Sequence, residues 1–367
     1  MPAQTDRPKK RNRLRFRRNT RRNTVPDRFR ADPTAPPPEI SVFLWNADSC
    51  VEEQDVQVRK ISLPTDPATR IWLNVSGLGD ADTIRRIGDQ FGLHPLALED
   101  VVHVHQRPKI EDYGDVLFLV SRMVTESEQF ETEQVSLFVG RKFIVTFQER
   151  PGDCFKQVRD RLRSGQGMMR SSGPDYLLYS LLDAIIDGYF PRVESSTRRL
   201  DYLEELIATT TRIDPMHAIR KMKTDLRMMR RTVTWQRDAL LMLVRGEFAP
   251  IAPSVRIYLR DCADHSMQLL DAIEMDREMC SDISDHYFAL LSIRNNDVSR
   301  VLTIIATLFM PMGVVAGIYG MNFDPSVSQW NMPELKWAWG YPFALSLMAT
   351  FAVGMTVWFW VRGWFHR

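Results

Sequence analysis

Two long uncharged stretches near the C-terminus constrain this chain more than any other feature. Residues 301–319 and 341–361, 19 and 21 residues long, contain no charged side chain. A helix of about 20 apolar residues spans the roughly 30 Å hydrocarbon core of a bilayer. Because a spanning segment must satisfy its own backbone groups, each stretch is predicted to be a transmembrane helix. The alternative is a pair of buried core helices, which does not explain why both stretches lie in the last fifth of an otherwise charged chain.

The most distinctive motif follows the first stretch. Gly320-Met321-Asn322 stands directly after it, and the segments 332–335 (Met-Pro-Glu-Leu) and 339–342 (Trp-Gly-Tyr-Pro) come next. In this position the motif closely resembles the signature of the CorA family of magnesium channels, Gly-Met-Asn. Residues 302–311 also look like that family, and the resemblance extends from about Ser41 to the C-terminus.

The resemblance implies an α+β membrane protein that assembles as a pentameric funnel. A cytoplasmic α/β/α domain would lead into a long stalk helix, which continues into the first of two C-terminal transmembrane helices. The expected parts are a disordered basic tail (1–40), a cytoplasmic α/β domain with long helices (41–254), a stalk helix (255–300), transmembrane helix 1 (301–319), an external loop with the motif (320–340), transmembrane helix 2 (341–361) and a cytoplasmic C-terminus (362–367).

The tail is set apart by its charge. Residues 1–30 contain twelve Lys or Arg and two Asp, a net charge of +10; since the whole chain has +2, the remaining 337 residues carry −8. The tail has too few apolar residues to offset the entropy of ordering, and three prolines at 36–38 separate it from the fold, so we expect disorder. It could contact anionic lipid headgroups or have no specific role. No interleaved aromatic residues or known motif indicate a specific nucleic-acid partner.

The region after residue 40 alternates between strand-like and helix-like patterns. Helical stretches are expected from about Asp80 to Gly92 and around 95–102, and a hairpin turn at Gly140-Arg141. This alternation indicates an α/β domain. The expected strands are 41–45, 70–75, 116–120, 134–139 and 142–148.

Helical periodicity dominates the rest of the chain. It begins at 155–163, runs from Asp175 through Leu206, breaks near 209–211 and resumes over 214–245. From Val255 the sequence contains no Pro or Gly until Pro311. A continuous helix from there to Tyr319 would approach about 100 Å at about 1.5 Å per residue. Such a helix is much longer than a membrane is thick, so it should begin as a cytoplasmic stalk.

Other motifs argue against an enzyme or a zinc protein. The four cysteines are widely spaced and form no CxxC pair, which suits a reducing compartment and gives no zinc signal. His103 and His105 would share one face of a strand, but residues 104–109 resemble a linking segment of the family, so a structural role is favoured. No Gly-rich phosphate loop, HExxH or GxSxG motif is present, so no enzymatic activity is expected.

The charges beside the apolar stretches predict the orientation in the membrane. Arg294 and Arg300 precede the first stretch, and Arg362 and Arg367 follow the second, whereas the loop 320–340 has two acidic residues and one Lys. The positive-inside rule therefore places both termini in the cytoplasm and the Gly-Met-Asn motif outside. We expect a multi-pass protein of the inner or plasma membrane that contacts membrane lipids.

A pore requires several copies of the chain, because two helices cannot enclose water. The first transmembrane helix carries a face of small or weakly polar residues at steps of three or four, which suits a cation that keeps its water, as Mg²⁺ tends to do. The alternative is that small residues at this spacing simply pack helices together, as in a small-xxx-small contact of Gly313 with Gly317. The expected pore-lining residues are Asn296, Ser299, Thr303, Ala306, Met310, Gly313 and Gly317, with the entrance at Gly320.

The expected selectivity filter is the motif itself, Gly320, Met321 and Asn322. A ring of Asn322 amide oxygens could accept hydrogen bonds from the waters of hydrated Mg²⁺. The family resemblance also implies a hydrophobic gate at Leu302 and Met310. Ser299 stands where many members have Met, and Gly313 where many have Thr, which affects the gate and the choice between Mg²⁺ and Co²⁺. The loop carries an extra segment, residues 324–331.

The resemblance further implies a regulatory metal site in the cytoplasmic part. Glu99 and Asp100 match a family segment that meets the stalk of a neighbouring subunit. Asp261 and Asp264 match the stalk side, and Asp183 matches another metal-site position. Carboxylates from two subunits repel one another unless a cation lies between them, so Mg²⁺ would favour a closed ring. The alternative is that these are ordinary solvated charges.

We therefore expect a magnesium channel that moves hydrated Mg²⁺ into the cytoplasm, driven by the membrane potential and gated by cytoplasmic Mg²⁺. Its partners would be further copies of itself, lipids and divalent cations, with Mg²⁺ as both cargo and regulator and Co²⁺ as a second ion. Zinc-exporting relatives replace the Met of the motif, so Met321 favours Mg²⁺. The alternatives are transport of Co²⁺, Ni²⁺ or Zn²⁺, and a membrane-anchored sensor of divalent cations that transports nothing.

Overall fold

The computed structural model describes residues 29, 31–32, 34–127, 129–209, 214–321, 323–324, 326–328 and 330–364. The chain divides into two compact units, Met1–Ser281 (the N-terminal unit) and Asp282–Arg367 (the C-terminal unit).

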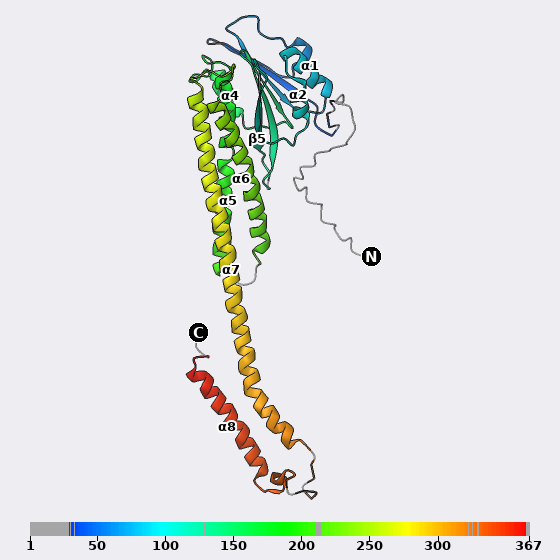
Figure 1. Ribbon diagram of the computed structural model, residues 1–367, viewed down its shortest axis with the longest axis vertical. Helices are drawn as coiled ribbons and strands as arrows, with labels where there is room; N and C mark the ends of the chain where they lie inside the picture. Colours follow the sequence, from blue (N-terminus) through cyan, green and yellow to red (C-terminus); the bar gives the residue numbers. More distant parts are fainter. Residues whose placement is uncertain are drawn as a thin grey trace. The chain divides into compact units, whose positions relative to one another are not determined.

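The described part of the N-terminal unit is built on one seven-stranded sheet with the order β2-β1-β3-β7-β6-β5-β4 (Figure 1). Only the central pair, β3 and β7, is parallel; the other neighbours are antiparallel. The five expected strands are confirmed, and the short edge strands β2 and β4 are additions. The strands are β1 (Glu39–Trp45), β2 (Cys50–Glu53), β3 (Arg70–Ser76), β4 (Lys109–Asp112), β5 (Leu117–Val124), β6 (Thr132–Val139) and β7 (Phe143–Gln148).

Helices cover both faces of this sheet, which confirms the expected α/β/α arrangement. The 3-10 helix η1 (Val58–Lys60), α1 (Ala81–Phe91) and α2 (Pro95–Val102) pack on one face, and α3 (Lys156–Ser164) and α4 (Pro174–Asp187) on the other (Figure 1). Local sequence sets the ends of α1. The Asp80 carboxylate accepts a hydrogen bond from the Asp82 N–H, and Gly92 adopts the left-handed conformation that commonly ends a helix.

The long helices begin after α4. They are α5 (Phe190–Thr209), α6 (Met216–Arg245) and α7 (Arg256–Tyr319). The periodicity from Asp175 to Leu206 suggested one helix, but the structure separates α4 from α5 at Gly188 and Tyr189. Tyr189 is fully buried and its hydroxyl donates a 2.7 Å hydrogen bond to the Arg122 carbonyl of β5. This tertiary contact fixes the break, which the apolar pattern alone could not show.

The end of the expected tail is part of the fold. Residues 29, 31–32 and 34–40 are described, and Phe29 packs against the core under the Arg85 guanidinium. The Gly79 N–H donates to the Pro36 carbonyl at 2.8 Å, and a Cβ on Gly77 would lie 2.3 Å from the Pro37 carbonyl oxygen. These residues therefore belong to the domain, which starts before the expected boundary at residue 41.

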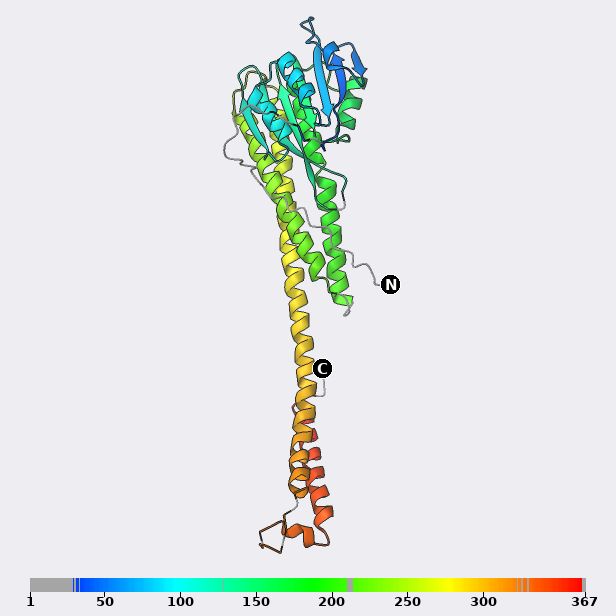
Figure 2. The ribbon, with the colours of Figure 1, turned by 90° about the vertical axis from the view of Figure 1, so that its right-hand side faces the viewer.

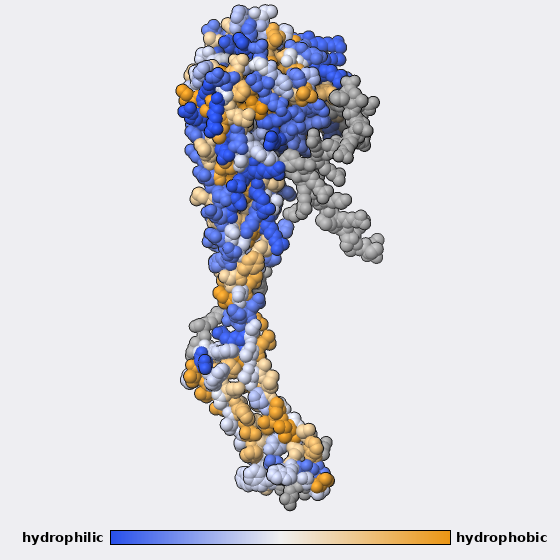
Figure 3. Space-filling view, viewed as in Figure 1, coloured by the Kyte–Doolittle hydropathy of each residue, from blue (hydrophilic) through white to orange (hydrophobic). Residues whose placement is uncertain are grey.

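The C-terminal unit contains the rest of α7, the 3-10 helix η2 (Pro333–Lys336) and α8 (Gly340–Val361). The expected single helix from the stalk into the first apolar stretch is present, because α7 continues for 64 residues through Pro311. Its apolar part and α8 are both long and apolar enough to cross a membrane, and little of either is buried within the chain. The chain then turns, so that α8 runs back in the opposite direction (Figures 1 and 2). Hydrophobic residues are prominent on the visible surface of this unit (Figure 3).

Candidate metal site and pore segment

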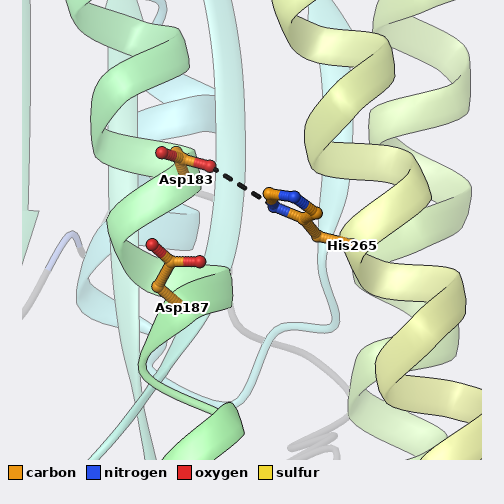
Figure 4. Close-up of side chains that lie close together, drawn as sticks. All are labelled: Asp183, Asp187 and His265. Atoms are coloured by element: carbon orange, nitrogen blue, oxygen red, sulfur yellow. Dashed lines mark ion pairs between the residues drawn. The ribbon is translucent and has the colours of Figure 1, made fainter.

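Three metal-ligating side chains of the N-terminal unit converge between α4 and α7. Asp183 and Asp187 lie one turn apart on α4, and His265 faces them from α7 (Figure 4). One ligand atom from each lies within 4.8 Å of the other two. The Asp183 Oδ1 and His265 Nδ1 atoms are 3.7 Å apart. Two carboxylates and an imidazole at this spacing form a donor set for a divalent cation.

The electrostatics of the cluster favour a bound cation. Asp183 is half-buried, and burial, together with the neighbouring Asp187 carboxylate, raises the pKa of the Asp183 carboxyl above its usual value. A cation between the two carboxylates would offset both effects. The Nδ1 atom of His265 is buried and finds no hydrogen-bond partner among the described residues, so this nitrogen is available as a ligand.

Side chains beside the cluster hold α4 against α7. The Tyr258 ring of α7 packs against the rings of Tyr176 and Tyr179 on α4, with centroids 5.3 and 5.2 Å apart. One oxygen of the buried Asp175 carboxylate accepts the Ala252 N–H at 3.0 Å, just before α7 begins. These contacts, all on the N-terminal side of Asp183 and of His265, fix the positions of the two helices next to the site.

Cys262 adds a sulfur next to the cluster. Its thiol is completely buried, and Sγ lies 3.7 Å from Asp183 Oδ1, to which it donates. Burial first, and then the Asp183 carboxylate, raises the pKa of this thiol. The thiol is therefore protonated at neutral pH and acts here as a weak hydrogen-bond donor.

Of the two stalk carboxylates expected to bind metal, only Asp261 adjoins the cluster. Asp261 precedes His265 by one helical turn, and its Oδ2 lies 3.9 Å from His265 Nε2, with 61% of its side chain exposed. Asp264 is also exposed and is not a member of the cluster. Both could still be reached by groups outside the chain.

Glu99 and Asp100 lie elsewhere, on α2, which covers the opposite face of the sheet from α4. Asp100 accepts hydrogen bonds from Lys109 Nζ at 2.6 Å and Gln106 Nε2 at 2.7 Å. Glu99 lies 3.8 Å from His103 Nε2. Within one chain, therefore, Asp100 is already paired with the Lys109 ammonium group, and neither Glu99 nor Asp100 joins the cluster around Asp183.

The expected pore residues lie on the C-terminal half of α7 and are exposed within the chain. From Val301 onward no charge interrupts them. Between Asn296 and Leu302, Arg300 is paired with Asp297 at 3.4 Å. The Thr303 hydroxyl donates to the Ser299 carbonyl at 2.8 Å, so its oxygen lone pairs remain open. The exposed positions are Asn296, Ser299, Leu302, Thr303, Ala306, Met310, Gly313, Gly317 and Gly320.

The motif itself is described only in part. The Gly320 N–H donates to the Ala316 carbonyl at 2.9 Å and extends α7 by one residue, and Met321 is exposed. Asn322 lies outside the described residues. On the other side of the loop, a Cβ on Gly340 would lie 2.1 Å from the Glu334 carbonyl oxygen, so only glycine allows α8 to start so close to η2.

Asp187 and His265 were not among the metal-binding residues predicted from the sequence. A signal existed, since Asp187 follows Asp183, and His265 follows Asp261, by four residues, the spacing that places two side chains on one helix face. What the sequence could not show is that these two helix faces oppose each other, since Asp183 and His265 are 82 residues apart in the chain.

Comparisons of the sequence with known proteins all match metal-ion transporters. Residues 68–363 match the family model described as CorA-like Mg2+ transporter protein. The chain is 38% identical over 329 residues to the Cobalt/magnesium transport protein CorA of Thermotoga maritima, covering 89% of this chain and 92% of that protein. It is 37% identical to the Putative metal ion transporter YfjQ of Bacillus subtilis, covering 80% and 90% of the two chains.

The fold is also shared with a solved structure. The complete structure of the CorA magnesium transporter from Methanocaldococcus jannaschii superposes with a TM-score of 0.76 at 19% identity, covering 88% of this chain and 98% of that one. At this identity the likeness concerns the fold.

Proposed function

The chain belongs to the CorA family of Mg²⁺/Co²⁺ transporters, and from this premise we propose that it forms a channel that admits hydrated Mg²⁺ to the cytoplasm. The driving force is the membrane potential, which contributes about 2.3 kcal/mol per charge per 100 mV. The protein resides in the inner or plasma membrane with both termini in the cytoplasm, as the arginines beside the two apolar helices indicate.

The single observation that carries this proposal is the uncharged, exposed face of α7 from Asn296 to Gly320. Apart from Leu302 and Met310, this face offers small or weakly polar residues. A hydrated cation can pass such a surface without losing its water, which Mg²⁺ gives up reluctantly. One α7 cannot enclose a pore, so several copies are needed, and the family supports a homopentamer in which each subunit supplies one α7.

Selection is assigned to the motif after α7. The Gly320 carbonyl and the Asn322 amide oxygen accept hydrogen bonds from water, so a ring of them holds a hydrated ion at the outer entrance. Neutral oxygens bind a divalent ion less strongly than carboxylates do and so release it more readily. Leu302 and Met310, which are 62% and 68% exposed in the single chain, supply the hydrophobic gate.

Regulation is assigned to the acidic cytoplasmic residues. Asp183, Asp187 and His265 form a site within one chain, and the exposed Asp261 and Asp264 extend it outward. Glu99 and Asp100 of a neighbouring subunit complete a bridge to them in the closed ring. Mg²⁺ at these positions stabilises the closed state, and its loss lets the carboxylates separate.

Mg²⁺ uptake into proteoliposomes tests the channel. Under a negative-inside potential and with a Mg²⁺-sensitive dye inside, the wild type should fill the vesicles, and Asn322→Ala should abolish the flux while the oligomer survives. Asn331→Ala, in the same loop, is the matched control and should keep its flux. No uptake by the wild type with internal Mg²⁺ removed would contradict the proposal.

Asp261→Lys tests the regulation separately. A permanent cation on the stalk should make the gate independent of internal Mg²⁺, either shut or open. Mg²⁺ inhibition of the same strength as in the wild type would refute the assignment of Asp261.

Co²⁺ is the second candidate cargo. The Thermotoga maritima relative is named for cobalt as well as magnesium. Uptake of Co²⁺ in competition with Mg²⁺ in the same vesicles distinguishes the two.

A further inference from the structure

The loop between α7 and α8 carries a segment that has no part in the proposed pore or metal cluster. Residues 324–331, the extra segment of this loop, lie between the Gly-Met-Asn motif and η2. Trp330 and Val327 of this segment are 93% and 79% exposed, and no large apolar side chain among the described residues is more exposed than Trp330. A single exposed apolar residue is ordinary on a protein surface, so what surrounds these two decides their role.

Hydrogen bonds within the segment hold its backbone together. The Asp324 carbonyl accepts the Val327 N–H at 3.3 Å and the Asn331 Nδ2 amide at 3.0 Å, so the two ends of the segment are tied to each other. The N–H groups of Trp330 and Asn331 donate to Ser328, to its Oγ at 3.2 Å and to its carbonyl at 3.1 Å. Backbone groups without partners are costly to remove from water, so a segment bonded in this way leaves water at a lower cost.

More aromatic side chains follow in the same loop and at the start of α8. Trp337, Trp339 and Tyr341 are 54%, 66% and 76% exposed in the single chain. Tryptophan and tyrosine are enriched where a membrane-spanning helix leaves the bilayer, because their rings are apolar and their N–H or O–H groups reach water. These three residues stand at the N-terminal end of a helix long and apolar enough to span a membrane, so this end is expected at a lipid interface.

The extra segment lies at that same end of the two apolar helices. α7 ends at Tyr319, α8 begins at Gly340, and the loop joins the two helices at one end of the C-terminal unit (Figure 2). When both helices span a bilayer, this end lies at its surface, where the headgroups and the first carbons of the acyl chains accept amphipathic rings.

The occupant that fits these observations is the headgroup region of the bilayer. A hydrated cation near Gly320 is best served by polar groups, so the two apolar side chains are more stable in lipid than at a wet pore entrance. The segment contains no Lys or Arg, so it has no special attraction to anionic lipid and a zwitterionic surface suffices. On the premise that α7 and α8 span the membrane, as proposed above, we propose that Val327 and Trp330 insert into the headgroup region and anchor the loop there.

The first experiment measures where the Val327 side chain lies in a bilayer. The full chain is reconstituted in phosphatidylcholine vesicles with one nitroxide spin label, attached at Val327→Cys. Cys50 and Cys154 are first changed to Ser; Cys262 and Cys280 are completely buried and do not compete for the label.

Two other valines, labelled in the same way, are the matched references. Val51, 52% exposed on β2, reports water, and Val353, 63% exposed on α8, reports lipid. Oxygen collects in lipid and a nickel chelate stays in water, so the ratio of their collision rates with the label measures the environment. The ratio at Val327 should lie between those at the two references.

Three outcomes would overturn the proposal for different reasons. A ratio at Val327 equal to that at Val51 places the side chain in water. Protection of Val327 from both oxygen and the nickel chelate shows that a second copy of the chain covers it. A ratio at Val353 equal to that at Val51 contradicts the membrane-spanning role of α8 itself, on which the anchor depends.

The fluorescence of Trp330 gives a second measurement that needs no label. Trp330→Phe removes one of nine tryptophans, so the wild-type emission minus that of the variant reports this ring. Phosphatidylcholine brominated close to the headgroup should quench this difference, and iodide in the water should not. Trp235→Phe, at a half-buried ring of α6, is the matched control, and its difference should not respond to brominated lipid. Quenching of the Trp330 difference by iodide but not by brominated lipid would overturn the assignment.

Discussion

Tryptophan side chains occupy opposite environments in the two units. In the N-terminal unit Trp45 and Trp72 are at most 1% exposed, whereas in the C-terminal unit Trp330 and Trp360 are 93% and 61% exposed. The N-terminal unit thus buries its large apolar groups within one chain. The C-terminal unit leaves most of them for lipid or for other copies of the chain, so its environment must supply its burial.

Substituting one tryptophan in each unit should show this contrast most strongly. Trp72 stacks on Phe43 at 5.0 Å and its Nε1 donates to Thr146 Oγ1 at 3.0 Å, so Trp72→Ala should cost about 3–5 kcal/mol of stability. Trp360→Ala should cost less than about 1 kcal/mol in detergent, because the ring is exposed. Urea unfolding of the full chain followed by circular dichroism measures both; equal losses would contradict the contrast.

Alanine substitutions at two glycines of the C-terminal unit should likewise differ in their effect on stability. Gly340→Ala forces a Cβ against the Glu334 carbonyl and should cost about 1–3 kcal/mol, with reduced Mg²⁺ uptake. Gly313 has nothing within 4 Å of such a Cβ, so Gly313→Ala should be tolerated by the single chain. If thermal denaturation in detergent shows that Gly313→Ala is the more damaging, another copy of the chain packs at Gly313.

A buried carboxyl makes the N-terminal unit sensitive to pH. Glu133 is 4% exposed with one oxygen unpaired among the described residues, and burial, reinforced by Glu149, raises its pKa to about 7. Because the folded pKa exceeds the unfolded value, the contribution of Glu133 to stability is greatest below about pH 4.5 and is lost as pH rises through 7.

Replacing this carboxyl by an amide should remove the effect. Glu133→Gln should be more stable than the wild type at pH 8, on the order of 1 kcal/mol after allowance for solvent screening, and indistinguishable from it at about pH 4. Glu131→Gln, two residues away and exposed, is the control. Thermal melts at both pH values measure this, and an unchanged pH dependence in Glu133→Gln would exclude Glu133 as its source.

An effect of similar size is expected at the metal cluster, on ion binding. Bound Co²⁺ should protect the chain from trypsin, and His265→Ala should raise the Co²⁺ concentration needed for protection about ten-fold, equivalent to about 1.4 kcal/mol. The Mg²⁺ concentration needed should rise less, because Mg²⁺ prefers oxygen donors. His217→Ala, an exposed His of α6, is the matched control. Equal Mg²⁺ and Co²⁺ losses would show that His265 acts through helix packing and is not a ligand.

Most of the fold could be predicted from local pattern. The five principal strands, the helices α1 and α2 and the two apolar helices followed from periodicity and from turn residues such as Asp80 and Gly92. The edge strands β2 and β4 could not be predicted, since each has only four residues and is formed by pairing with a neighbour. The break at Tyr189 depended on a hydrogen bond to a residue 67 positions away.

The candidate sites show the same distinction between features set by local sequence and features set by tertiary packing. The sequence by itself determined the apolar helices, the uncharged face of α7 and the Gly-Met-Asn motif after it, because these depend on spacing along a single helix. Only the tertiary structure decided that Asp183 and Asp187 meet His265 and that Asp100 is paired with Lys109. The physical reason is that such sites join side chains from elements distant in sequence, whose packing no local pattern encodes.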